Sequence, residues 1–144
     1  MATQSHWFFW ALSSAVFAAL TAIFAKVGLQ GVDSDFATLI RTAFILLVLM
    51  MFVSVTDKWQ SPSTLSPATW GWLLASALAT GASWICYFRA LQAGNTSPVA
   101  AVDKLSLVLV AVFAFAFLHE RLNLREWLGI ALVSAGIITL AFKR

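Results

Sequence analysis

Long apolar blocks separated by short polar segments dominate the pattern of this 144-residue chain. A bilayer core about 30 Å thick requires ~20 apolar residues at a rise of ~1.5 Å each. Five blocks reach that length, at residues 7–30, 36–56, 68–92, 98–118 and 124–142. Backbone polar groups in lipid must be satisfied within the segment, so these blocks predict membrane-spanning α-helices. We therefore expect an all-α integral membrane protein with five transmembrane helices and one domain over residues 1–144.

Short polar residues and a glycine mark the ends of the predicted helices. Candidate N-terminal caps, whose side chains accept the first free N–H groups, are Asp35, Ser66, Ser97 and Asn123. Both serines precede a proline, which suits the first turn of a helix. Glu126 follows Asn123 by three residues, the spacing of a capping box. Gly31 follows the first block, where a left-handed helix stop favours glycine.

Composition supports the membrane assignment and narrows the chemistry. Hydrophobic residues make up 61% of the chain and charged residues 10%, far from the averages of water-soluble proteins. The net charge of +3 comes without a basic stripe, so we expect no nucleic-acid partner. Cys86 is the only cysteine, and the two histidines lie at helix ends. We therefore expect no disulfide, metal, cofactor or hydrolytic catalytic triad.

An odd number of crossings places the two termini on opposite sides, here called side A (N-terminal) and side B. Six of the seven tryptophans fall on side A, as in an interfacial aromatic belt. Loops and tails carry three bases on side A, Lys58, Arg121 and Arg125, against Lys143 and Arg144 on side B. This balance leaves the orientation open, including insertion in both directions.

Ionisable residues inside the spans gather at the side B ends of four helices. They are Lys26, Arg41, Arg89, Asp103 and Lys104. Charges in a membrane usually pair with one another or line a wet cavity. Neighbouring helical residues point about 100° apart, so we expect Asp103 to pair with a base of another helix rather than with Lys104. Arg89 is the nearest candidate, and Arg41 and Lys26 come next. Ser106 would share the face of Asp103 at i+3.

Two roles are open for this cluster of charges. Asp103 would be a proton carrier or a substrate counter-ion in one, and part of a structural or gating ion pair in the other. The bases that converge on side B favour the ion pair. Trp84 and Tyr87, at i and i+3 of the third helix, would either wall a site for an apolar ligand or pack against other helices.

A resemblance to a known family rests on several short motifs. They are the early arginine of the second helix in "ATLIRTAFILLVL", the segments "YFRAL" and "HERL", and the glycines of the fifth helix, Gly129 and Gly136. Together they resemble the EamA-like family of the drug/metabolite transporter superfamily. Typical members have ten helices in two five-helix halves of opposite topology, and export metabolites, amino acids or drugs. The present chain resembles one half.

The resemblance implies how a half-size chain would work. A second copy inserted the other way up would recreate the inverted repeat, with a site between the copies near the midplane. We therefore expect an antiparallel homodimer in a bacterial or archaeal cytoplasmic membrane, exporting small amphipathic or aromatic metabolites by alternating access. The alternative is a non-transporting membrane subunit or scaffold of a larger complex.

Overall fold

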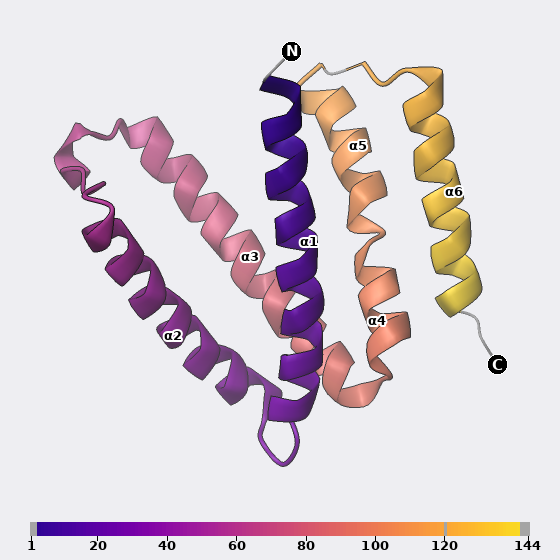
Figure 1. Ribbon diagram of the computed structural model, residues 1–144, viewed down its shortest axis with the longest axis horizontal. Coiled ribbons are helices and arrows are strands. Elements are labelled where there is room, and N and C mark those ends of the chain that lie inside the picture. Colours follow the sequence, from indigo (N-terminus) through magenta and orange to yellow (C-terminus); the bar gives the residue numbers. More distant parts are fainter. Residues whose placement is uncertain (1–2, 120, 142–144) are drawn as a thin grey trace. The chain divides into compact units, whose positions relative to one another are not determined.

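The structure is a computed structural model that describes residues 3–119 and 121–141, with side chains from residue 6 onward (Figure 1). The described helices are α1 (Thr3–Gly28), α2 (Ser34–Val55), the 3-10 turn η1 (Pro62–Thr64), α3 (Pro67–Ala93), α4 (Thr96–Asp103), α5 (Ser106–Phe117) and α6 (Leu124–Ala141). Five helical segments are long and apolar enough to cross a bilayer, with α4 and α5 forming one of them. The chain is a multi-pass, all-α integral membrane protein, as predicted.

The fourth span differs from the continuous helix expected over 98–118. It is interrupted after Asp103, and the helix resumes at Ser106. At the interruption the N–H of Lys104 donates to Ala101 O at 3.0 Å, and that of Leu105 to Val102 O at 2.9 Å. These bonds reach back three residues instead of four, which is the tighter 3-10 pattern. Figure 1 shows the ribbon lose its α-helical coil between α4 and α5, which follow one another along the same span.

Two of the predicted helix starts are confirmed. The backbone N–H of Asn123 donates to Glu126 Oε2 at 2.7 Å, and that of Glu126 donates to Asn123 Oδ1 at 3.0 Å. This reciprocal pair is the predicted capping box of α6. Ser66 Oγ accepts the N–H of Thr69 at 3.1 Å and so caps α3.

The other two predicted caps are wrong. Asp33, not Asp35, caps α2, because its Oδ1 accepts the N–H groups of Asp35 and Phe36 at 2.9 and 3.1 Å. This places Asp35 inside the first turn, where its side chain is available for other contacts. Ser97 lies inside α4, whose N-cap is Asn95 and carries no side-chain cap bond. Gly31 does adopt the expected left-handed conformation, with φ of 74°.

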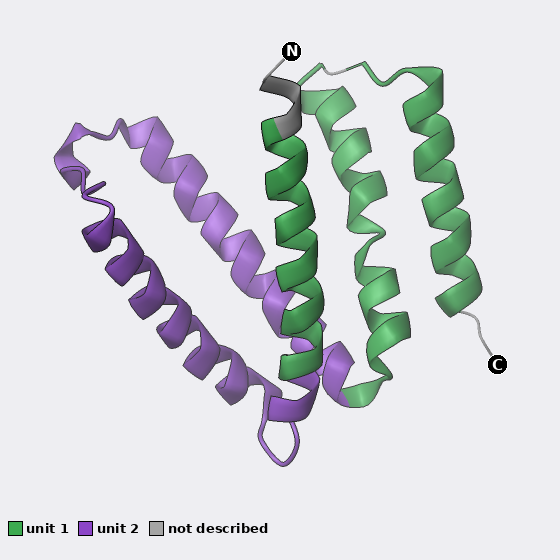
Figure 2. Cartoon of the chain, in the orientation of Figure 1, with its two compact units in different colours: residues 1–24, 93–144 green, residues 25–92 purple. Residues whose placement is uncertain are grey.

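The chain divides into two compact units (Figure 2). Residues 25–92 hold the last turn of α1 together with α2 and α3. Two polar contacts tie the helix ends of this unit. Lys26 Nζ donates to the carbonyl of Leu91, and Gln92 Nε2 donates to Val32 O at 2.9 Å. The ends of α1 and α3 and the start of α2 therefore lie on one side, as the helix count predicts for side B.

The other unit comprises residues 1–24 and 93–144. Within it α6 packs against both α4 and α5 (Figure 2). Small or branched side chains, Ala111 of α5 and Ile137 of α6, are buried. Close approach of helices through small residues is the usual basis of packing in lipid, where apolar surface gives no drive of its own.

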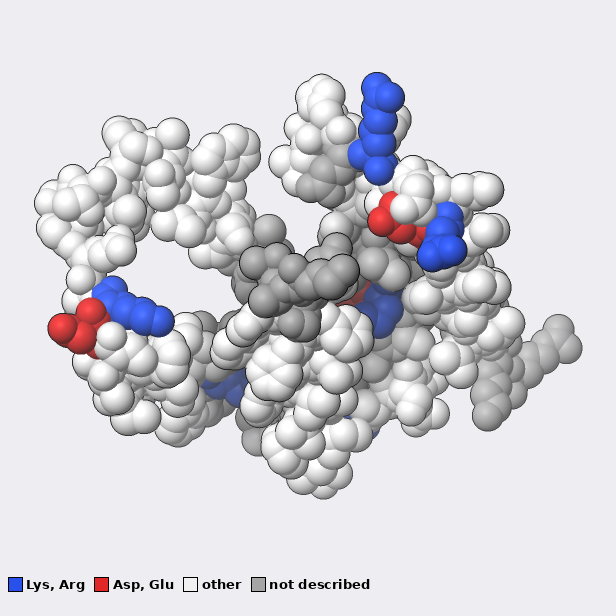
Figure 3. Space-filling model, turned by 45° about the horizontal axis from the view of Figure 1, so that its top comes forward, with Lys and Arg blue, Asp and Glu red and all other residues white. Residues whose placement is uncertain are grey.

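Most of the apolar surface of the single chain is uncovered. Large side chains of the spans such as Phe44 and Leu132 are 64% and 74% exposed. Charged side chains interrupt this surface at only a few places on the face drawn in Figure 3. An uncharged outer surface of this kind is suited to contact with acyl chains.

Candidate functional site

An open groove of about 520 Å³ lies between α2 and α3, within residues 25–92. Its lining consists of Asp35, Thr38, Leu39 and Thr42 from α2, and Ala77, Thr80, Gly81, Trp84 and Ile85 from α3. The exposed lining is almost entirely apolar. The small residues Ala77 and Gly81 of α3 leave open space, and the larger Leu39, Trp84 and Ile85 border it. A groove of this size and character can hold the apolar body of a small molecule.

Three threonines supply the hydroxyl groups of the groove. Thr38 Oγ1 donates to Ser34 O at 2.7 Å, and Thr42 Oγ1 donates to Thr38 O at 2.8 Å. Thr80 Oγ1 donates to Ser76 O at 2.9 Å. Each hydroxyl hydrogen is thus committed to the carbonyl one turn earlier on its own helix. The groove therefore offers hydroxyl oxygens as acceptors for a ligand donor.

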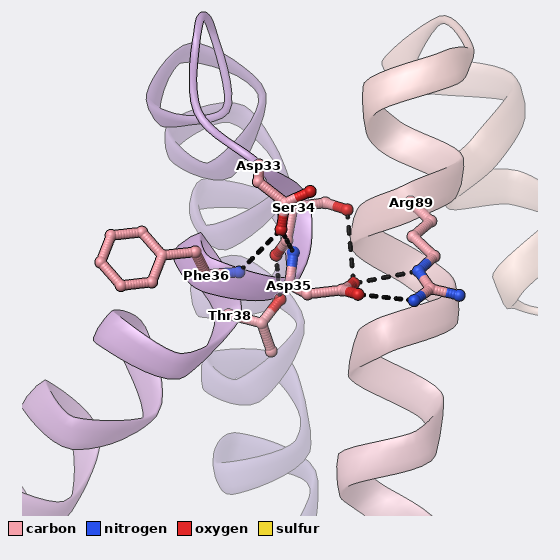
Figure 4. A network of polar contacts seen from close by, with 6 residues as sticks. All are labelled: Asp33, Ser34, Asp35, Phe36, Thr38 and Arg89. Atoms are coloured by element: carbon pink, nitrogen blue, oxygen red, sulfur yellow. Dashed lines mark hydrogen bonds and ion pairs between the residues drawn. The ribbon is translucent and has the colours of Figure 1, made fainter.

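A two-point ion pair closes the side B end of the groove (Figure 4). Arg89 Nε donates to Asp35 Oδ1 at 2.9 Å, and Arg89 Nη2 contacts Asp35 Oδ2. Ser34 Oγ donates to the same Oδ1 at 3.5 Å. The predicted pairing of Arg89 with Asp103 is wrong, since Nε and Nη2 of Arg89 both bond the carboxylate of Asp35. The Asp33 cap leaves the Asp35 carboxylate free to form this pair.

Arg41 lies on two aromatic rings of α3. Its Cζ is 4.3 Å from the ring centre of Phe88 and 5.3 Å from that of Trp84, as in cation–π contacts. Phe88 is 2% exposed, and Tyr87 packs edge-on against it at 5.6 Å. Arg41 Nη1 is buried, and within the described residues it has no hydrogen-bond partner.

Asp103 and Lys104 pair with one another, contrary to the prediction. Lys104 Nζ lies 3.1 Å from Asp103 Oδ2, and both side chains are partly exposed. The prediction assumed a continuous helix, on which adjacent side chains diverge. Because α4 ends at Asp103, Lys104 follows in a turn and its side chain can reach back. Ser106 is the first residue of α5. Its predicted shared face with Asp103 required a continuous helix, and the interruption lies between the two residues.

Comparison with known proteins identifies the family. The sequence profile of the EamA-like transporter family matches residues 5–142. The chain belongs to this family. It is 57% identical over 138 residues to an uncharacterized transporter encoded in the cobO 3' region of Sinorhizobium sp, covering 96% of the present chain and 98% of that protein.

A more distant relative carries a more specific name. It is the probable 4-amino-4-deoxy-L-arabinose-phosphoundecaprenol flippase subunit ArnE of Salmonella heidelberg, 31% identical over 107 residues. The match covers 67% of the present chain and 94% of ArnE. No solved structure matches the chain. The protein is thus an EamA-family transporter, and the matches span nearly the whole length of both bacterial relatives.

In this EamA chain the predicted site residues fall in both units. Lys26, Arg41, Trp84, Tyr87 and Arg89 lie in residues 25–92, whereas Asp103, Lys104 and Ser106 lie in residues 93–144. Of the first set, Trp84 lines the groove, Arg41 stacks on Trp84, and Arg89 pairs with a lining residue. Lys26 holds the end of α3 through the Leu91 carbonyl.

Two residues of the groove region escaped the prediction. Asp35 was assigned to capping, although the run Asp33-Ser34-Asp35 offers two carboxylates for one cap and so signals a spare acid. Phe88 is one of many phenylalanines in apolar helix, and nothing in its sequence context separates it from the others.

Proposed function

We propose that the protein transports small amphipathic or aromatic molecules across the membrane as an antiparallel homodimer. The observation that carries this proposal is the α2–α3 groove, whose apolar walls end at a charged pair. An apolar body bound along the walls and a polar group near Asp35 and Arg89 would satisfy both parts of the groove. Aromatic substrates are favoured because Trp84 presents a flat ring in the lining.

The number of spans supports the proposed dimer. Five crossings give a chain with its termini on opposite sides, and a second copy of opposite orientation would form an inverted repeat. The large uncovered apolar surface is available for such an interface as well as for lipid. A site shared by two inverted copies can open alternately to the two sides, which is the basis of alternating access.

The Asp35–Arg89 pair is the proposed gate. Both side chains are substantially exposed, at 46% and 62%, so the pair can separate and re-form with solvent replacing each partner. A ligand group that binds one partner would compete with the other and shift the population toward the open state. Metabolite export is the proposed direction of transport, in line with the family.

Transport by purified protein in liposomes tests this function. We expect saturable uptake of an aromatic amphiphile such as labelled indole acetate, and loss of uptake when Trp84→Leu removes the ring from the groove. Leu132→Ala, a substitution at an exposed position of α6, is the matched control and should leave uptake unchanged. No uptake above protein-free liposomes for any of a panel of amphiphiles would contradict the proposal.

A second candidate function is that of a subunit in a larger flippase or scaffold. It is favoured by the similarity to ArnE, which is named as a subunit. Purification from the native membrane separates the two functions. A self-associated protein active by itself supports the homodimer, whereas inactivity by itself together with a stoichiometric second protein supports the subunit role.

A further inference from the structure

Arg41 presents an unused donor inside a membrane span. Its guanidinium lies against Phe88 and Trp84, and the buried Nη1 lacks a hydrogen-bond partner in the described part of the chain. Aromatic rings stabilise the positive charge but accept no conventional hydrogen bond from the in-plane N–H groups. A buried donor without a partner is costly, and native structures rarely keep one without a reason.

The carboxylates described in residues 25–92 do not supply this reason. Two ion pairs are present among the described residues, and they commit Asp35 to Arg89 and Asp103 to Lys104. Asp33 caps α2. Asp57 follows the opposite end of α2, sixteen positions or about 24 Å of helix rise from Arg41. No carboxylate of residues 25–92 is therefore paired with Arg41.

The charge of Arg41 adjoins the groove through Trp84. The Trp84 ring lines the groove and also lies under the Arg41 guanidinium. Thr38 and Thr42, which flank Arg41 on α2, line the groove as well. Asp35 and Arg89 neutralise each other at the groove end, whereas Arg41 lies beside the groove without a carboxylate partner in residues 25–92. Arg41 is half-buried, and its buried Nη1 would reach a ligand by reorientation of the long side chain.

We propose that Arg41, supported by Trp84 and Phe88, binds the carboxylate or phosphate of an anionic amphiphile whose apolar body lies in the α2–α3 groove. This assignment rests on the proposed transport function and narrows its substrate class from amphiphiles to anionic ones. A planar guanidinium forms strong, charge-assisted hydrogen bonds with both kinds of anion. A second apolar hollow of about 440 Å³, which shares Ala77 with the groove and continues along α3 to Trp70, extends the space for the apolar body.

Equilibrium binding to the full-length protein in phosphatidylcholine nanodiscs tests the assignment. The probes are benzoate and benzyl phosphate, with benzyl alcohol and benzylammonium as the neutral and cationic counterparts. We expect the wild type to prefer both anions to the alcohol. Arg41→Gln should weaken binding of the anions by about tenfold or more while leaving that of the alcohol unchanged. The anion affinities of Arg41→Lys should lie between those of the wild type and those of Arg41→Gln, because lysine keeps the charge but lacks the planar pair of donors.

Arg125→Gln is the matched control, since it removes an exposed arginine from the first turn of α6 and should leave all four affinities unchanged. Nanodiscs that contain phosphatidylglycerol distinguish a lipid anion from a soluble one. If a lipid occupies the site, phosphatidylglycerol will lower the benzoate affinity of the wild type but not that of Arg41→Gln. If the site selects soluble anions, the benzoate affinity of the wild type will not change.

Equal wild-type affinity for benzoate and benzyl alcohol, or the absence of anion binding, would overturn the assignment even if every Arg41 variant failed to fold. So would an Arg41→Gln protein that loses self-association but keeps the anion preference, because Arg41 would then bond the second copy. Liposome transport separates this proposal from the general one. Equal transport of anion and alcohol rejects the anion site alone, whereas selective binding without transport rejects the transport function alone.

Discussion

Phe88 is the residue at which stability and the candidate site meet. It is one of the two most deeply buried large side chains of the described chain, together with Leu91. Its ring also carries the Arg41 guanidinium, at 4.3 Å. Truncation would therefore remove both packing and the surface against which the charge is held.

Phe88→Ala should destabilise the protein markedly, whereas Phe44→Ala on the exposed face of α2 should be close to neutral. The cost should stay below the ~3–5 kcal/mol typical of such truncations in water-soluble cores, because lipid solvates apolar side chains in the unfolded reference state as well. Reversible unfolding in mixed micelles measures the free energy of unfolding of the two variants. Equal destabilisation by the two variants would show that Phe88 is not packed as described.

The Asp35–Arg89 pair makes a second prediction at this scale. Arg89→Gln and Asp35→Asn should each lower stability, because each leaves one charge of the pair unpaired within a span. The double variant should lose less than the sum of the two single losses. A double-mutant cycle on unfolding in micelles measures this coupling, with Asp57→Asn and Lys58→Gln in the loop as the control cycle. Strict additivity at positions 35 and 89 would contradict the ion pair.

The helices show how far local sequence rules reach. The five spans are predictable from apolar length, and the starts of α3 and α6 from capping signals within four residues. The sequence predicts the α2 cap two residues late, because Asp33 and Asp35 both lie at the start of that helix and local rules do not rank them. The interruption after Asp103 has no proline or glycine to announce it, so a continuous span was the natural expectation.

The site is less predictable than the helices for a related reason. That Arg41, Arg89 and Trp84 belong to the region of the site is predictable, because such residues are rare inside apolar segments. Their partners lie in another helix, and Asp35 and Arg89 are 54 residues apart in the chain. Which carboxylate meets which base depends on helix rotation, and apolar periodicity fixes rotation poorly when nearly every position is apolar.

Two asparagines give a matched test of capping. Asn123→Ala should cost about 1 kcal/mol of stability, because its side chain and Glu126 form reciprocal bonds at the start of α6. Asn95→Ala should cost less, since Asn95 precedes α4 without a side-chain cap bond. The free energies of unfolding of the two variants, measured in micelles, test this order. A larger loss at position 95 than at position 123 would contradict the assigned caps.

At the scale of the whole molecule, composition predicts the environment and the number of spans but not the orientation. The bases of the loops and tails are nearly balanced between side A and side B. Each unit is well defined by contacts among its own helices. An odd-span protein with balanced flanking charge is the kind for which both orientations are accessible.

Reporter fusions at the C-terminus should therefore detect that end on both sides of the cell membrane. Replacing Arg121 and Arg125 with glutamine should shift the population toward side B in the cytoplasm, because basic loops are retained there. Paired reporters active in the cytoplasm and outside it measure the ratio. A C-terminus found on one side alone, unmoved by the double substitution, would rule out the antiparallel arrangement.

The interruption between α4 and α5 also bears on how this protein enters the membrane. The two segments have eight and twelve residues, about 12 and 18 Å of helix, so neither alone crosses a core of about 30 Å. They must be inserted together as one stem. Charged side chains are costly in contact with acyl chains, so the side of the stem bearing Asp103 and Lys104 must be shielded by protein or water. After insertion the stem must therefore rotate about its axis until this side faces protein or water, and its apolar residues do not determine that rotation.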